Sequence, residues 1–482
     1  MLSRATYLRQ VPNPTSFPRI TLRLSSIQHF GTVRTKLHKR TMVTSSKIQL
    51  SPSQQPELYL PGISSETADT ASELLQENHE KHHIFFRQDG FHNHIVHHLL
   101  TIFALNASPP TLKRQYDLNA IYQRPPSTLD TTIVKDMHLP DRYKTYLGNQ
   151  KYYNDFLVFF QDEIEKKGWE NVLNEYVFKG DDRADDMLVR MFAGFLHPII
   201  HLGFGIEFQQ PAIMAEALAQ AAVHDAWIGA LFYGCEKAAK ANSLDRRPTK
   251  TLVQLLDEIR ADEKLSTAAH WDDGNKIRDG ILKRAPEEMI KYASQYLVPE
   301  GQLEEKTAEM INAAVYYTGS AQHPPNQVKF DFYYMHCVNA SIFFSSFLKQ
   351  SWLSSANKIR LLEWKVRIDL AMYASRRSPR LNPSEITNYR SKRDSNWTEI
   401  FERVKEFEDD GHASKLVRAL ANGEKACKKF EDKEGFVIKG DMWRLLGNMV
   451  IDSVEEGEPV WVRSAGFEEA WEKVPERETA RL

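Results

Sequence analysis

The chain has 482 residues, of which 42% are hydrophobic and 26% are charged, so it is long enough to bury a large core. A formal net charge of −2 gives no long-range attraction for nucleic acid or for an acidic membrane surface. Its apolar stretches are shorter than the roughly 20 residues that a membrane-spanning helix needs. Because Cys235, Cys337 and Cys427 show no paired spacing, any metal must be bound through nitrogen and oxygen.

The first 56 residues differ from the rest of the chain. They carry six Arg and three Lys with no Asp or Glu, and they are rich in Ser, Thr and Pro. This composition is typical of a mitochondrial targeting segment, and equally of a disordered extension or of a gene model whose working start is Met42. We therefore predict a disordered or targeting extension over 1–56 and a cytoplasmic protein, with the mitochondrion as the alternative location.

From residue 57 onward the pattern is helical. Apolar residues recur at spacings of three and four through 152–178 and 211–241, and no run of alternating strands with hairpin turns is present. Proline- and glycine-rich stretches at 106–110 and 319–327 separate predicted helices. These features predict an all-α fold: a single large domain over 57–482, with a helical portion after about residue 395 packed onto it.

The stretch "GFHNHIVHHLL", residues 90–100, concentrates four histidines. On a helix, His94 and His98 share the apolar stripe, whereas His92 and His97 are rotated away from it. Two histidines at i and i+4 can reach one metal ion. The alternative is that both are core residues with hydrogen-bond partners, and the segment alone does not decide between the two.

Histidines with similar helical placement occur later in the chain. His197 and His201 are again four apart, with Pro198 suited to the first turn of a helix. His336 lies on an apolar helical face, where a core histidine bonded to a carbonyl is the alternative. Together the pairs favour a metal site between core helices.

Lys365 occupies an apolar helical stripe. Burial there would favour its neutral amine, which can capture carbon dioxide as a carbamate and become an anionic oxygen ligand. The alternative is a lysine that reaches water or pairs with Asp369 or Glu363. A donor set of imidazole and oxygen suits iron, zinc, copper or nickel. A dinucleotide fingerprint and a P-loop are absent from the sequence.

Six stretches in order resemble the questin oxidase-like family over about residues 57–471: "HHIFFRQDGFHNHIVHHLLTIFALNAS", "YDLNAIYQRP", "GFLHPIIHLGFGIEF", "FYYMHCVNASIFF", "EWKVRIDLAMYASRRSP" and "WVRSAGFEEAW". The resemblance implies an oxidoreductase, a monooxygenase or dioxygenase of fungal secondary metabolism. Such an enzyme opens the central ring of an anthraquinone, a Baeyer-Villiger-like outcome, and consumes dioxygen and NADPH. The implied partner is a small aromatic polyketide, and the implied cofactor is non-haem Fe(II) with a carboxylated lysine.

Carried over by position, the resemblance assigns the metal ligands and catalytic groups. Because four imidazoles would suffice, we expect one of five histidines, His197, not to bind the metal. Aromatic side chains near the motifs are expected to line a flat pocket, and Arg87 to face an acidic oxygen unless it lies on the surface. The candidate ligands are His94, His98, His197, His201, His336 and carboxylated Lys365, with His197 as the histidine expected not to bind. The expected pocket aromatics include Phe85, Phe86, Phe91, Tyr333, Phe343 and Phe344.

Two other functions fit parts of the sequence. His224 and Asp225 are adjacent, as in HD-type metal phosphohydrolases, which are also all-α. A non-catalytic helical protein that binds aromatic pathway intermediates would use the histidines only as core hydrogen-bonding groups.

Overall fold

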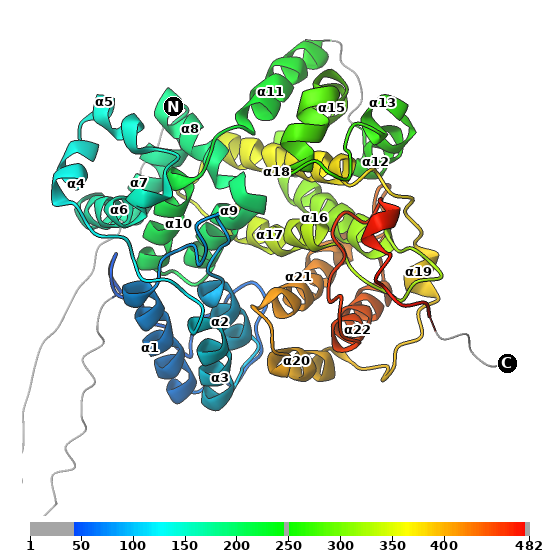
Figure 1. Ribbon diagram of the computed structural model, residues 1–482, viewed down its shortest axis with the longest axis horizontal. Helices are drawn as coiled ribbons and strands as arrows, with labels where there is room; N and C mark the ends of the chain where they lie inside the picture. The colour runs from blue at the N-terminus through cyan, green and yellow to red at the C-terminus, as the bar shows by residue number, and fades with distance from the viewer. Residues whose placement is uncertain (1–42, 245–249, 478–482) are drawn as a thin grey trace, which may run out of the picture. The chain divides into compact units, whose positions relative to one another are not determined.

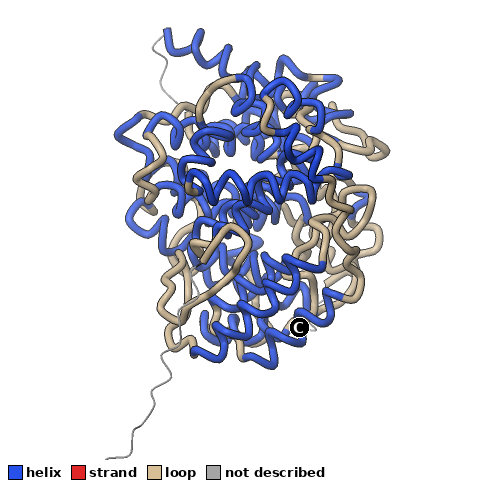
Figure 2. Tube along the Cα trace, turned by 90° about the vertical axis from the view of Figure 1, so that its left-hand side faces the viewer, coloured by secondary structure: helices blue, strands red, loops and turns tan. Residues whose placement is uncertain are grey.

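The computed structural model describes residues 43–244 and 250–477, and this part of the chain is built from helices. Figure 2 shows helices joined by loops throughout, and β-structure in the described ranges is limited to isolated bridges. The all-α prediction is confirmed. In chain order the α-helices are α1 (Ser65–Lys81), α2 (Ile95–Ala104), α3 (Pro109–Ala120), α4 (Thr131–Met137), α5 (Pro140–Tyr143), α6 (Tyr153–Lys167), α7 (Trp169–Leu173), α8 (Asp182–Met191), α9 (Ala193–Glu207), α10 (Pro211–Val223), α11 (Gly229–Leu244), α12 (Leu252–Ala261), α13 (Glu263–Ser266), α14 (Leu282–Arg284), α15 (Pro286–Ala293), α16 (Leu303–Ser320), α17 (Phe332–Leu348), α18 (Ser355–Ser375), α19 (Ser384–Thr387), α20 (Trp397–Glu406), α21 (His412–Cys427) and α22 (Met442–Glu455).

The centre of the molecule is formed by helices that are buried on nearly every side. All ten residues of α2 are buried, as are all of α10 except its first and nearly all of α16 and α17, which is the pattern expected for helices enclosed by other helices. Helix α9 packs on α10 and α17, and α17 packs on α16 and α21. In Figure 1 the N-terminal helices, blue, and the C-terminal helices, orange, both lie below α9 and α17, and α2 contacts α21. The segment after 395 therefore contributes to the core.

The two long helical stretches are divided at identifiable residues. Gly168, with φ of 79°, ends α6 and starts α7, and residues 174–178 form a π-helical turn. In the second stretch, α10 ends before His224, whose extended backbone (φ −83°, ψ 158°) begins a loop that leads to α11. The apolar spacing of three and four correctly predicts helices in both stretches, but it does not show where one helix ends within an apolar run.

The ordered body begins before residue 57. Ser45 donates from its backbone and its hydroxyl to Glu165, and Ile48 and Leu50 are buried against α1. These hydrogen bonds and apolar contacts correct the expected boundary for residues 43–56. Residues 1–42, including the targeting segment that we predict, lie outside the described residues.

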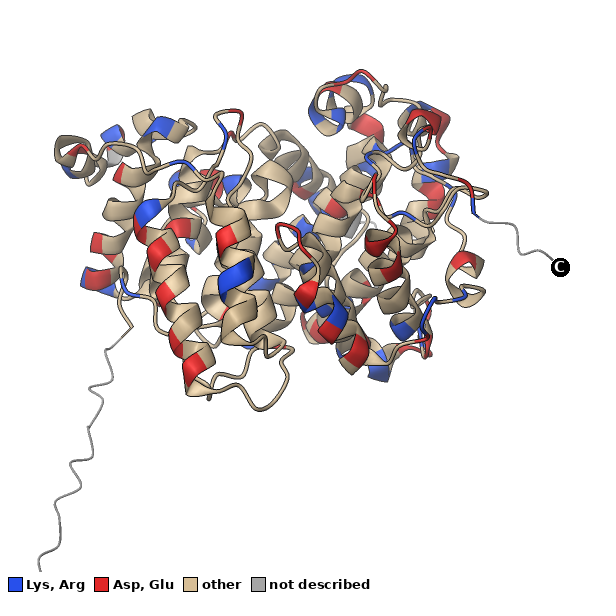
Figure 3. Cartoon of the chain, turned by 60° about the horizontal axis from the view of Figure 1, so that its bottom comes forward, with Lys and Arg blue, Asp and Glu red and all other residues tan. Residues whose placement is uncertain are grey.

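Within the described ranges, no single helix is both long and apolar enough to cross a membrane, and α8 and α9, which reach that length only together, are bent by 97° where they meet. Figure 3 shows acidic and basic residues interspersed along the helices rather than gathered by sign.

Candidate metal centre and substrate pocket

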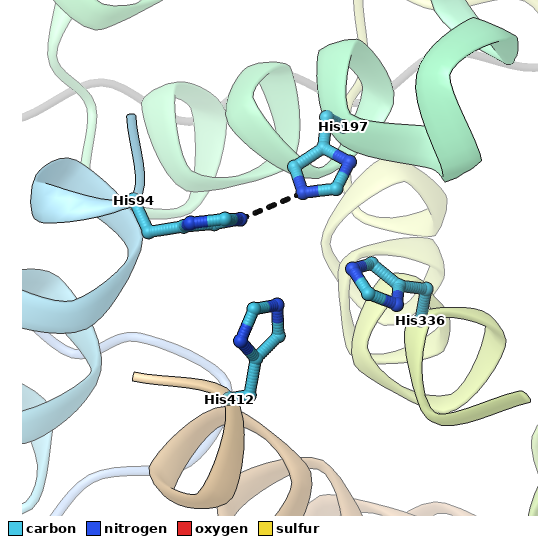
Figure 4. A group of neighbouring side chains, drawn as sticks. All are labelled: His94, His197, His336 and His412. Atoms are coloured by element: carbon cyan, nitrogen blue, oxygen red, sulfur yellow. Dashed lines mark hydrogen bonds between the residues drawn. The ribbon is translucent and has the colours of Figure 1, made fainter. Parts of the chain in front are cut away.

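Four buried histidines converge at the centre of the molecule. One ring nitrogen from each lies within 4.8 Å of a ring nitrogen of each of the others. Figure 4 shows the four rings facing a common space, although they come from four different elements. The four residues, called the histidine cluster below, are His94, His197, His336 and His412.

His94 reaches the cluster from the residue that caps α2. The preceding segment is extended, because Asn93 donates its backbone N–H to Ile84 and Phe85 forms an antiparallel bridge with His92. The Asn93 side chain then accepts the backbone N–H of Ile95, and the helix begins there. The helix therefore starts four residues later than the apolar stripe from residue 91 implies.

His197 follows a left-handed turn. Gly194, Phe195 and Leu196 have φ values of 53°, 55° and 71°, a conformation that is strained for the two residues with side chains. The turn brings the carbonyl oxygen of Gly194 to 2.5 Å from Nδ1 of His197, so this nitrogen donates to it. His197, which we expected not to bind the metal, is therefore part of the cluster.

The other two histidines are held by α17 and α21. Nδ1 of His336 donates to the carbonyl oxygen of Phe332, at 2.6 Å, one turn earlier in α17. His412 is the first residue of α21, and its Nδ1 donates to Oδ1 of Asp410. The second oxygen of the same carboxylate lies 3.1 Å from Nδ1 of His94. Asp410 thus orients two members of the cluster.

The hydrogen bonds determine which ring nitrogen carries the proton. Nδ1 of His197, His336 and His412 donates to an oxygen that only accepts, and Nδ1 of His94 lies 3.1 Å from a carboxylate oxygen of Asp410, so the proton is placed on Nδ1 and Nε2 presents a lone pair. The Nε2 atoms of His94 and His197 lie 2.8 Å apart, and those of His336 and His412 have no hydrogen-bond partner in the described part of the chain. Lone pairs at this separation repel each other unless a cation lies between them.

A metal ion is a better candidate than a proton for the cation between these Nε2 lone pairs. Burial is the main reason that the pKa values of His197 and His336 fall well below their usual range, and burial also lowers the pKa of His412 to about 3. The rings are therefore neutral at physiological pH, the state in which imidazole binds a metal. Fixing the proton on Nδ1 through a carbonyl or carboxylate is also how proteins orient histidine ligands.

A pocket of about 470 Å³ reaches the cluster, a volume within the range of small-molecule sites. His94 and His197 form part of its wall. Phe332 also lines it, with its ring centroid 4.7 Å from that of His336 and 5.1 Å from that of His412. Several aromatic side chains contribute to the wall: Phe85, Phe91, Phe192, Phe195, Trp227, Phe332 and Tyr333.

Another pair of histidines lines the same pocket. His92 stacks on His197 with 3.8 Å between ring centroids, and its Nε2 lies 2.8 Å from Nε2 of His224. A Cβ atom on Gly194 would come within 2.8 Å of both rings, so a glycine is required where this pair meets the left-handed turn. His92 is buried, although the helical pattern turned it away from the apolar stripe, and His224 is half-buried.

Two of the predicted ligands lie outside the cluster. His201 uses both ring nitrogens elsewhere, Nε2 with Glu216 at 2.7 Å and Nδ1 with His97 at 3.1 Å. His98 is buried against Gly411 and neither of its nitrogens has a partner in the described ranges. His412, which the sequence reasoning missed, takes a place in the cluster; the signal was the polar turn "DDGH" directly before an apolar helix.

Lys365 is buried as predicted, but it pairs with Asp369 one turn along α18, next to Met310 of α16. That arrangement matches the alternative interpretation. A different lysine, Lys415, lies one turn after His412 and is also buried. Burial, opposed by the two aspartates before the helix, lowers its pKa to about 8, and its Nζ makes no hydrogen bond or ion pair in the described part of the chain.

The predictions for the pocket aromatics and for Arg87 are confirmed only in part. Of the predicted aromatic residues, Phe85, Phe91 and Tyr333 line the pocket, whereas Phe86, Phe343 and Phe344 do not. Arg87 is exposed and paired with Asp89, so the surface interpretation holds for it.

The buried carboxylate of Glu216 links two histidines near the cluster, His79 and His201. This carboxylate accepts from His79 at 2.6 Å and from His201 at 2.7 Å. Burial alone would raise the pKa of Glu216, but these hydrogen bonds outweigh it and hold the pKa at about 2. The carboxylate therefore stabilises the fold above its unfolded pKa of 4.5, and this contribution is lost as the pH falls from 4.5 towards about 2.

Glu216→Gln should lower the free energy of unfolding at pH 7 by about 3 kcal/mol, because a neutral amide would replace the charged acceptor of two buried hydrogen bonds. It should also flatten the dependence of stability on pH between 4.5 and about 2. Urea unfolding across this pH range checks both effects, with the exposed Glu73→Gln on α1 as control. Equal stability curves for the two variants would refute the assignment.

The fold and the site define an all-helical protein with a buried histidine centre that is reached through an aromatic pocket. The family model described as Questin oxidase-like matches residues 91–420, and the chain belongs to this family. It is an oxidoreductase.

Three relatives match most of the chain. A Baeyer-Villiger monooxygenase of Cryptosporiopsis sp. is 42% identical over 442 residues, which are 89% of this chain and 99% of the relative. A Baeyer-Villiger oxidase of Pestalotiopsis fici is 42% identical over 84% of this chain and 93% of its own length. The questin oxidase of Aspergillus fumigatus is 38% identical over 90% of this chain and 100% of its own length.

Proposed function

We propose that the protein is a non-haem iron oxygenase that opens the central ring of an anthraquinone-type polyketide in fungal secondary metabolism. The observation that carries the proposal is the set of four neutral imidazoles whose Nε2 lone pairs converge beside an aromatic pocket. The names of the relatives, questin oxidase and Baeyer-Villiger oxidase, support the substrate class and the type of reaction.

His94, His197, His336 and His412 would hold the metal, and iron bound there would supply the activation of dioxygen. His94 and His197 are the two candidate ligands that also line the pocket, so a metal held by the cluster would be accessible from it. The aromatic side chains pack on a flat ring system and keep water from it. Beside them, the Nε2 atoms of His92 and His224 share one proton, which gives the substrate a neutral hydrogen-bonding neighbour.

We assign the carboxylated lysine to Lys415 instead of Lys365. The neutral Nζ would attack carbon dioxide, form the N–C bond and release one proton to solvent, which turns a cation into an anionic oxygen donor. Lys415 shares α21 with His412, and the pKa of its amine is low enough for the neutral form to be populated near pH 8. Lys365, in contrast, already neutralises the buried carboxylate of Asp369.

Ring opening is tested by a single-turnover experiment. Protein purified without chelator is incubated anaerobically with questin and then exposed to ¹⁸O-labelled dioxygen, with and without NADPH. The expected product is a ring-opened benzophenone acid that carries ¹⁸O, formed by protein that contains about one iron per chain.

Other results would overturn the proposal. Full activity in protein stripped of metal would exclude the histidine cluster as the reaction centre. Release of phosphate from nucleotides would favour an HD-type phosphohydrolase, although Asp225 is exposed and His224 pairs with His92. Binding of questin without any turnover would identify a binding protein for aromatic intermediates.

A further inference from the structure

The backbone on both sides of Arg463 is held by hydrogen bonds. Before it, Val462 donates to the carbonyl oxygen of Phe330 at 3.1 Å and accepts the backbone N–H of Phe332 at 2.8 Å. After it, the backbone N–H groups of Ser464 and Ala465 donate to one oxygen of Asp331, at 2.6 and 2.7 Å.

Asp331 also caps α17, because its other oxygen accepts the N–H groups of Tyr333 and Tyr334. One buried carboxylate thus couples the segment that carries Arg463 to the helix that carries His336. The backbone position of this arginine relative to α17 is therefore fixed by the fold.

Residues 462, 464 and 465 are buried, whereas Arg463 is exposed and its side chain lines the pocket. Its guanidinium carbon lies 4.8 Å from the centroid of the Phe332 ring, the same ring that contacts two histidines of the cluster. Within the described ranges this guanidinium makes no ion pair. The other arginine of the pocket, Arg278, already donates from Nε and one terminal nitrogen to Asp279.

We propose that Arg463 forms an anion subsite, which binds an acidic oxygen of the aromatic substrate, a phenolate or a carboxylate, while the ring system lies along Phe332 and Tyr333. A guanidinium offers several donors in one plane, which suits an oxygen carried on a flat ring. The subsite thereby sets which edge of the ring system faces His94 and His197. This inference rests on the proposed function for the substrate class, because the pocket and its free arginine do not by themselves name an anthraquinone.

Binding to metal-free protein tests the subsite separately from catalysis. The dissociation constants of anthraquinone-2-carboxylate, 2-hydroxyanthraquinone and 2-methoxyanthraquinone are measured by quenching of tryptophan fluorescence. In Arg463→Gln, binding of the acidic probe that uses the subsite should weaken by about 10- to 100-fold, the effect of losing a charge-assisted hydrogen bond. The methoxy compound should bind equally to both proteins, and Arg463→Lys should recover part of the loss.

The two acidic probes distinguish a carboxylate from a phenolate as the natural group. Arg393→Gln, at an exposed arginine outside the pocket, is the matched control and should change no constant. Equal binding of both acidic probes by Arg463→Gln and the unaltered protein would overturn the inference. Ring opening by the unaltered protein is scored separately, so a failure of the proposed function is recognised on its own.

Discussion

His412→Ala is expected to leave the purified protein without stoichiometric iron and to lower ring-opening activity by more than about 100-fold, since loss of even a supporting partner of a ligand costs about 10- to 100-fold. The substitution removes one of four converging lone pairs and also frees one oxygen of Asp410, which orients His94. Metal analysis of protein prepared without chelator gives the iron content, and circular dichroism shows whether the helices are retained.

The comparison with His98→Ala makes this test sharp. His98 was expected to be a ligand, yet it lies outside the cluster, so this variant should keep its iron even if the cavity that it creates lowers the melting temperature. His138→Ala, at an exposed histidine outside the cluster, serves as the control. Iron retained by His412→Ala and lost by His98→Ala would show that the cluster is not the metal site.

The spacing rule for histidines failed for a physical reason. Residues four apart share a face only when both belong to a regular helix, but His94 is the residue before α2, and His197 follows a left-handed turn. His98 and His201, their partners at i+4, lie inside the regular helices and point elsewhere. Three of the four members of the cluster stand where a helix begins, a feature that a pattern of apolar residues does not reveal.

Long-range contacts set the rest of the site. The all-α fold follows from periodicity within single helices, which a sequence shows directly. The packing of α21 against α2 and α17 cannot be read from that periodicity, and this packing brings His412 to the cluster. Likewise, Gly411, with φ of +87°, permits this approach because a Cβ there would lie 2.6 Å from the Cβ of His98. Such close contacts depend on tertiary packing.

Different outcomes are expected for substitutions of Lys415 and Lys365. Lys415→Met should lower the affinity for iron by more than about 10-fold, because the anionic oxygen donor is lost while the four imidazoles remain. Lys365→Met should keep its iron but lower the free energy of unfolding by about 3–5 kcal/mol, since the carboxylate of Asp369 would stay buried without its partner. Urea unfolding and metal analysis separate the two effects.

Labelling identifies the modified amine directly. In protein exchanged with ¹³C-bicarbonate, a carbamate carbon resonance is expected in the unaltered protein and in Lys365→Met, and it should be absent from Lys415→Met. A resonance that survives in Lys415→Met and disappears in Lys365→Met would return the carbamate to Lys365. It would then require α18 to turn this side chain from Asp369 towards the cluster, at the cost of a buried ion pair.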